Sequence, residues 1–171
     1  MADFSSFFKS QYSIGELLNI DMARQQKSQN CSVNLVKIFH ELKEESLLDK
    51  FKAFFLGKSV VKGYYVIFKL EVTSDSGKKH VVLIRTEPDF NLSIYNNNKV
   101  KIYCDCDDFK YRAAYGLNKR NSLLLTSRTS SQLGPAITQS PRKQSVTLLC
   151  KHAYAALGWL FQNYQSVMRT I

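Results

Sequence analysis

Two short pairs of metal-binding residue types constrain this sequence more than any other feature. They are Cys104-x-Cys106 and Cys150-x-His152, which use three of the four cysteines and one of the three histidines. Strand side chains alternate with a period of two, so a Cys-x-Cys pair on a strand points both sulfurs to one face, where one ion can bind both thiolates. Residues i and i+2 of a helix do not face each other, so the second pair fits a helix start, with Cys150 at or before the first turn. The spacing predicts a strand, a long excursion and a helix tied together by one ion.

A set of three cysteines and one histidine completes a closed tetrahedral zinc site with no position open for a substrate. Two other interpretations of these residues remain. The cysteines could be ordinary buried thiols beside a hydrogen-bonded histidine, because free cysteine is commonly buried. A Cys104–Cys106 disulfide is the other, although two residues on the same face of a strand lie near the upper limit for bridging. Two spacings that both fit a ligand geometry favour zinc.

The order of these pairs, strand first and helix second, resembles the SWIM zinc finger, whose four ligands match Cys104, Cys106, Cys150 and His152. Here 43 residues separate Cys106 from Cys150, more than most SWIM modules carry. Three segments are also similar to zinc-motif virion proteins of tailed phages: CDCDDFKYRAAY, then GPAIT with a Pro-Arg pair after it, then LCKH and a helix rich in small residues. This likeness covers residues 104–157, about a third of the chain.

Charge is distributed unevenly along the chain, whose net charge is +10. Residues 1–108 contain all fourteen acidic residues, whereas residues 109–171 contain none. The bases of the second part are Lys110, Arg112, Lys119, Arg120, Arg128, Arg142, Lys143, Lys151 and Arg169. This asymmetry has two equally favoured interpretations. Residues 109–171 could bind a polyanionic or acidic partner, or they could form a soluble basic surface with no particular ligand. The first seven of these bases are our candidate contacts with a partner or a nucleic acid.

Cysteine usage and the absence of long apolar runs indicate the compartment. Cys31 is left alone once the ligands are assigned, which does not suggest a secreted disulfide scaffold. The start MADFSSFFKSQYSIGELL lacks a basic segment followed by an apolar run, and no apolar run reaches membrane-spanning length. We expect a soluble, cytoplasmic chain without a membrane partner, or a virion protein made in the host cytoplasm if a phage encodes it.

We expect residues 1–57 to form an N-terminal helical segment. Aromatic residues near helical spacing open it and predict either a core staple or a docking segment for a neighbour: Phe4, Phe7, Phe8 and Tyr12. A helix is predicted from Ser32, with an apolar face of Val33, Val36, Ile38, Phe39 and Leu42. Another is predicted from a Ser46 cap to a Gly57 stop. Cys31 and His40 have no partners at ligand spacing, so we interpret both as structural.

Residues 58–171 are predicted to form an antiparallel meander of about four strands and the zinc module, as one compact unit with the helical segment. The hairpin VVKGYYVIFKLEVT–SDSG–KKHVVLIRTE comes first, NLSIY gives a third strand, and VKIYCDC delivers the first two ligands. His80 follows two lysines and is expected to be exposed. The fold class is therefore α+β.

The segment after the first ligand pair predicts a short helix over DFKYRAAYGLNKR and a further strand at LLLT. Residues 126–148 are rich in Ser and Thr, which predicts an extended loop that could lie on another protein. A zinc-stapled helix from Cys150 to about Met168 closes the chain.

The sequence carries no pattern of an enzyme that we recognise. It lacks the ligand pattern of zinc deaminases and a phosphate-binding glycine loop, and we interpret Asp105, Asp107 and Asp108 as solvated charges or partners of His152. We therefore predict a non-enzymatic zinc protein without a small-molecule substrate. The favoured role is a virion structural protein that binds neighbouring subunits through its basic loop and terminal aromatics. The alternative is a SWIM-type nucleic-acid binder that uses the basic half.

Overall fold

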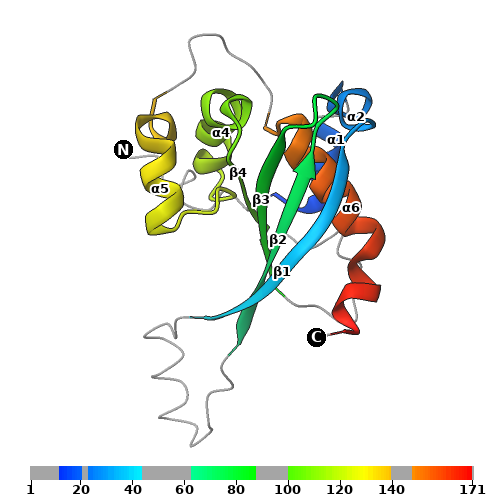
Figure 1. The fold of residues 1–171 in the computed structure, drawn as a ribbon. Coiled ribbons are helices and arrows are strands. Elements are labelled where there is room, and N and C mark those ends of the chain that lie inside the picture. The colour runs from blue at the N-terminus through cyan, green and yellow to red at the C-terminus, as the bar shows by residue number, and fades with distance from the viewer. Residues whose placement is uncertain (1–11, 21–22, 44–62, 88–99, 140–147, 171) are drawn as a thin grey trace, which may run out of the picture.

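A four-stranded antiparallel sheet carries one long helix across one of its faces and shorter helices around it (Figure 1). The computed structural model describes residues 12–20, 23–43, 63–87, 100–139 and 148–170. The predicted α+β class, the antiparallel meander and the C-terminal helix are confirmed.

The strands are β1 (Ser32–Leu42), β2 (Tyr64–Thr73), β3 (Lys79–Thr86) and β4 (Lys101–Cys104), in the order β1-β2-β3-β4. β2 and β3 form the predicted hairpin. Its turn needs Gly77, whose φ of 76° lies in the left-handed region that L side chains rarely adopt.

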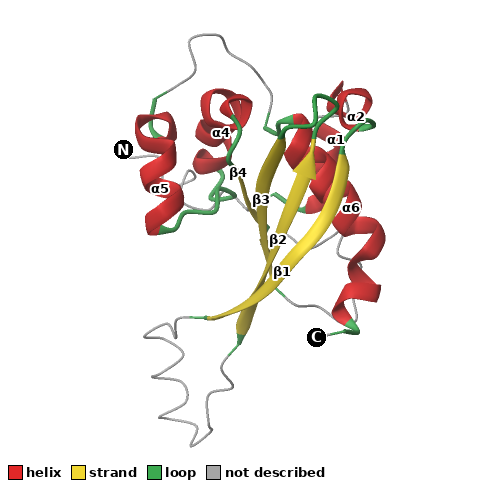
Figure 2. Ribbon diagram, in the orientation of Figure 1, coloured by secondary structure: helices red, strands yellow, loops and turns green. Residues whose placement is uncertain are grey.

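Figure 2 shows the helices on both sides of the sheet. They are α1 (Ile14–Ile20), α2 (Ala23–Ser28), the π-helix η3 (Phe109–Ala113), α4 (Ala114–Lys119), α5 (Ser127–Leu133), the 3₁₀ turn η4 (Gly134–Ile137) and α6 (Lys151–Met168). α1 and α2 contact α6, whereas α4 and α5 lie on the other side, beyond β4.

The first strand corrects a prediction, because β1 occupies the residues for which we predicted a helix from Ser32. An irregularity between Leu35 and Lys37 shifts the register, so that Leu35 pairs with Leu70 and Ile38 with Phe68. Cross-strand partners share a face, so apolar residues three apart reach the same side of the sheet. A strand with such a bulge can therefore carry apolar residues at the three-residue spacing expected of a helix face.

Several predicted features lie outside the described residues. They are the aromatics Phe4, Phe7 and Phe8, the helix over 46–57, the NLSIY strand and the bases Arg142 and Lys143. The four strands of the described sheet therefore include β1, which was predicted as a helix, and do not include NLSIY.

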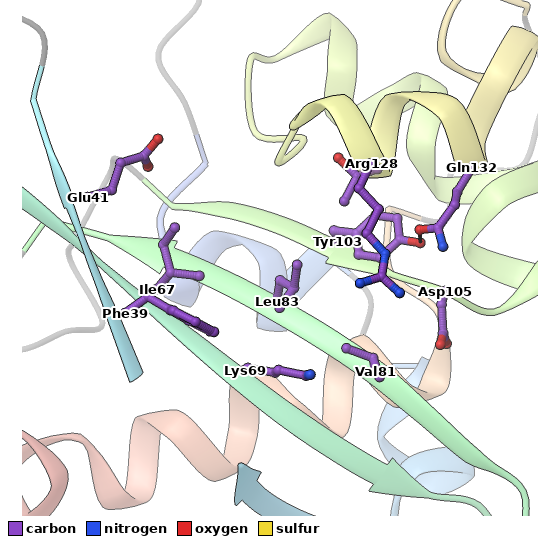
Figure 3. Close-up of a pocket in the computed structure, with 11 residues that line it drawn as sticks. Phe39, Glu41, Ile67, Lys69, Val81, Leu83, Tyr103, Asp105, Arg128 and Gln132 are labelled. Atoms are coloured by element: carbon purple, nitrogen blue, oxygen red, sulfur yellow. Dashed lines mark hydrogen bonds between the residues drawn. The ribbon is translucent and has the colours of Figure 1, made fainter. Parts of the chain in front are cut away.

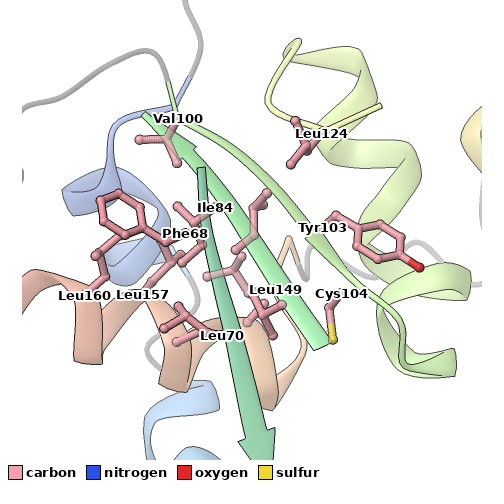
Figure 4. Packing of buried hydrophobic residues seen from close by; sticks show 14 of the residues in the cluster. Phe68, Leu70, Ile84, Val100, Tyr103, Cys104, Leu124, Leu149, Leu157 and Leu160 are labelled. Atoms are coloured by element: carbon pink, nitrogen blue, oxygen red, sulfur yellow. The ribbon is translucent and has the colours of Figure 1, made fainter. Parts of the chain in front are cut away.

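A large part of the core lies between the sheet and α6, and buried side chains of η3, α4 and α5 belong to the same cluster (Figure 4). Alternate residues of β2 are buried, in the half-buried pattern that period-two alternation produces. Phe68 from β2 is fully buried and meets the ring of Tyr164 edge to face, with centroids 6.1 Å apart. Leu157 and Leu160 bring α6 onto the same layer. Each large apolar side chain contributes about 1.5–3 kcal/mol when buried.

The predicted extended loop 126–148 is wrong in its first half, which contains α5 and η4. Thr126 and Thr129 form a reciprocal capping box, and Thr129 also donates a hydrogen bond to the Leu124 carbonyl at 3.0 Å. Ser and Thr favour helix caps as strongly as loops, so the composition was ambiguous. The predicted LLLT strand reduces to a single bridge between Leu123 and Ile102.

Candidate metal centre

The first ligand pair lies where β4 ends and the chain turns toward η3. Cys104 is the last residue of β4 and is fully buried, and Cys106 is only 5% exposed. The backbone N–H of Phe109 donates to Cys106 Sγ at 3.3 Å. Backbone N–H donors favour the charged form of the acceptor, so this contact prepares Cys106 to bind a cation as a thiolate.

The second pair lies at the start of α6, as its spacing predicts. Cys150 is the N-cap residue, with extended backbone, and its Sγ accepts a hydrogen bond from the Ala153 N–H at 3.3 Å. His152 lies in the first turn. The positive end of the helix dipole favours a thiolate at this position.

The four side chains converge on one point from two distant parts of the chain. The ligand atoms of Cys104, Cys106, Cys150 and His152 all lie within 4.8 Å of one another, and all four residues are buried. Zinc–sulfur bonds of about 2.3 Å in a tetrahedron place ligand atoms about 4 Å apart, so this spacing fits one zinc ion.

The imidazole of His152 supplies a further test of that fit. Both of its ring nitrogens are buried and lack a hydrogen-bond partner among the described residues. A buried polar atom without a partner is unfavourable, and a metal ion bound to one nitrogen would remove that penalty.

The pKa values of the three thiols are also shifted by their surroundings. Burial raises the pKa of the Cys104 and Cys150 thiols well above its usual value. Hydrogen bonds from Cys104 and Cys150 lower the pKa of Cys106. A divalent cation would supply the positive charge that stabilises all three thiols as thiolates.

His80 corrects another prediction, because it is buried and not exposed, at 8% exposure. Its ring stacks on that of His152, with centroids 4.0 Å apart and planes inclined by 29°. Its Nδ1 lies 3.1 Å from Oδ1 of Asp105. The neighbouring Lys78 and Lys79 suggested exposure, but strand alternation turns His80 toward the core.

This geometry agrees with a comparison of the sequence with known families. Residues 80–118 and 148–158 match the family model of the SWIM zinc finger. This part of the chain is a SWIM zinc finger. The gap in the match coincides with the long segment between the ligand pairs, so the SWIM site is assembled around an insert. The predicted ligand order and a site positioned to bind one zinc ion are confirmed.

No curated protein and no solved structure matches the chain significantly. Within the described residues, no helix is both long and apolar enough to cross a membrane.

The candidate contact bases that the structure describes are spread over several elements. Lys110 and Arg112 lie on η3, and Lys119 and Arg120 lie at the end of α4. Arg128 lies apart from them, on α5. Arg112 is engaged by Asp108 in an ion pair, whereas Lys119 and Arg120 lie over the rings of Tyr115 and Tyr12.

Sequence reasoning missed two residues beside the site. His80 could have been found from the alternation of its strand, which places it on the face of Val82 and Ile84. Tyr103 precedes the first ligand and is buried, and its hydroxyl donates to Gln132 of α5. No local pattern indicates that contact.

Proposed function

We propose that this chain is a non-enzymatic assembly protein, a zinc-stabilised component of a phage virion that binds neighbouring subunits. The observation that carries the non-enzymatic part is the closed ligand set. Four protein side chains surround one point and all are buried. A catalytic zinc keeps a position for water or substrate, and this set of ligands fills every tetrahedral position.

The role of the ion in this proposal is to hold the fold together. It ties the end of β4 to the start of α6 across the insert of the SWIM site. Closing such a long segment is entropically unfavourable, and structural zinc commonly contributes on the order of 10 kcal/mol to folding. A fold fixed in this way can present its surfaces to neighbours.

The virion setting rests on the sequence likeness of residues 104–157 to phage virion proteins. The neighbour-binding role is supported by large apolar side chains on the surface of β1 and α6. Val36 is 52% exposed, Leu42 is 68% exposed and Phe161 is 43% exposed. Single exposed apolar residues are ordinary, but the edge strand β1 carries three, Phe39 among them, and such a strand is suited to subunit contact.

Nucleic-acid binding is the second candidate, favoured by an aromatic and basic surface on η3. Tyr111 is 62% exposed, and the Lys110 ammonium lies 5.4 Å from the centre of its ring. An exposed ring beside cations is the arrangement that stacks on single-stranded bases and neutralises phosphates.

Analytical ultracentrifugation of the zinc-loaded protein, alone and with single- and double-stranded DNA, separates the two functions. The assembly role predicts self-association or binding to co-purified virion subunits, with no DNA complex at physiological salt. A DNA complex that weakens steeply with salt, and that Tyr111→Ala also weakens, would replace the assembly role with the second candidate.

A further inference from the structure

A groove crosses the sheet face that turns away from α6 (Figure 3). Its volume is about 410 Å³, within the range of sites that bind ligands or peptide side chains. Its lining comes from all four strands and from α5: Phe39, Glu41, Ile67, Lys69, Val81, Leu83, Tyr103, Asp105, Arg128, Thr129 and Gln132.

The floor of the groove is apolar. Ile67, Val81 and Leu83 point into it from the two central strands, and Phe39 closes one side, with its side chain 39% exposed. Covering such side chains contributes about 25 cal/mol per Å² of apolar surface. The groove therefore favours a partner that brings apolar side chains.

The acidic groups that line the groove have partners within the described residues, whereas two of its basic groups have none. Glu41 is held by Arg85 at 3.0 Å, and Asp105 is in contact with His80. Lys69 and Arg128, in contrast, form no ion pair with any described residue. Figure 3 shows the Arg128 guanidinium extending from α5 over the groove. Within the described residues, neither cation is neutralised by a paired carboxylate.

We propose that this groove docks an acidic, apolar segment of a partner protein. Apolar side chains of the segment would cover the floor, and its carboxylates would meet Lys69 and Arg128. A segment of chain fits better than a small molecule because the lining extends across four strands and a helix. The proposal rests on the assembly role and names the chemistry of one partner surface.

The SWIM site and the groove share one stretch of backbone. Tyr103 and Asp105 line the groove, whereas Cys104 and Cys106, which alternate with them, face the metal position. The Tyr103 hydroxyl also holds Gln132 of α5, the opposite wall. Zinc bound by Cys104 and Cys106 would therefore fix the groove wall formed by Tyr103 and Asp105, and we expect removal of zinc to weaken docking.

A labelled synthetic peptide that alternates leucine and glutamate is a direct probe, with a leucine–glutamine peptide of the same length for comparison. Fluorescence anisotropy with the zinc-loaded full chain should show about tenfold tighter binding of the glutamate peptide. Arg128→Gln and Lys69→Gln should each remove most of that preference. Lys119→Gln makes the same change of charge outside the groove and should preserve it.

Equal affinity for the two peptides would overturn the proposal. So would equal losses in Arg128→Gln and Lys119→Gln, because these would report net charge alone. Leu83→Glu should abolish binding of both peptides while circular dichroism and zinc content stay unchanged; retained binding in that folded variant would place the peptide elsewhere.

The assembly role can fail separately. If subunits associate and Arg128→Gln has no effect on either association or peptide binding, the groove proposal fails and the assembly role stands. If the peptide binds as expected but the protein associates only with DNA, the docking site stands and the assembly role fails.

Discussion

The imidazole of His80 lies against the imidazole of His152, with ring centroids 4.0 Å apart. The Nδ1 atom of His80 lies 3.1 Å from the carboxylate of Asp105, the residue between the ligands Cys104 and Cys106. The segment that carries the first ligand pair thus contacts, through His80, the histidine of the second pair. Groups that contact metal ligands in this way commonly set the ligand orientation and the affinity of the site.

Replacing His80 should therefore weaken zinc binding without removing a ligand. We expect His80→Ala to lower zinc affinity by about 10–100-fold, measured by competition with a chromophoric chelator. His80→Phe should recover part of the loss because it restores a ring against His152. His40→Ala is the matched control, because that ring meets Tyr64 of β2, away from the site. Unchanged affinity in His80→Ala would show that the stacked ring has no influence on the ligand.

Two helical glycines should respond differently to the same methyl group. A Cβ at Gly158 of α6 meets nothing within 4 Å, whereas one at Gly116 of α4 would lie 2.7 Å from Leu148 Cδ2. Gly158→Ala should raise the free energy of unfolding of the zinc-loaded protein by about 0.5–1 kcal/mol. Gly116→Ala should gain less, or destabilise, because Leu148 must move. Urea unfolding that ranks Gly116→Ala as the more stable variant would contradict this packing.

Tyr103 should make stability depend on pH in the alkaline range. Burial raises the pKa of its hydroxyl to about 12. The neutral form is thus favoured in the folded state, so its contribution is complete below the unfolded pKa of about 10 and is lost as pH rises toward 12. Over that range the wild type should lose stability relative to Tyr103→Phe. Tyr111→Phe removes an exposed hydroxyl, so the stability of this variant should depend on pH as that of the wild type does. If the stability of Tyr103→Phe also follows the wild type over this pH range, folding does not disfavour ionisation of the Tyr103 hydroxyl.

The ligand site could be predicted from sequence because its information is local. The two-residue spacing of Cys104 and Cys106 fixes a common face on a strand, and Cys150 with His152 fits only a helix start. The hairpin was equally accessible, since alternating residues and a turn at Gly77 lie within one short stretch.

The errors arose where distant residues decide the structure. The apolar residues of β1 have a helix-like spacing because of an irregularity between Leu35 and Lys37, which is visible only in the pairing of β1 with β2. α5 resembled a loop because threonines favour caps and loops alike. The groove draws on four strands and α5, so no single segment of the sequence indicates it. The identity of the partners and the loop predicted over residues 140–147 stay predictions.

Native mass spectrometry of the folded protein tests the central claim, that one zinc ion ties the sheet to α6. We expect a mass one zinc above that of the bare chain. Chelation and Cys150→Ser should both remove the ion and cause unfolding, whereas Cys31→Ser, which alters a half-buried thiol outside the ligand set, should leave it bound. Folded, undamaged protein that carries no zinc, or a Cys150→Ser variant as stable as the wild type, would show that no zinc ion holds the sheet and α6 together.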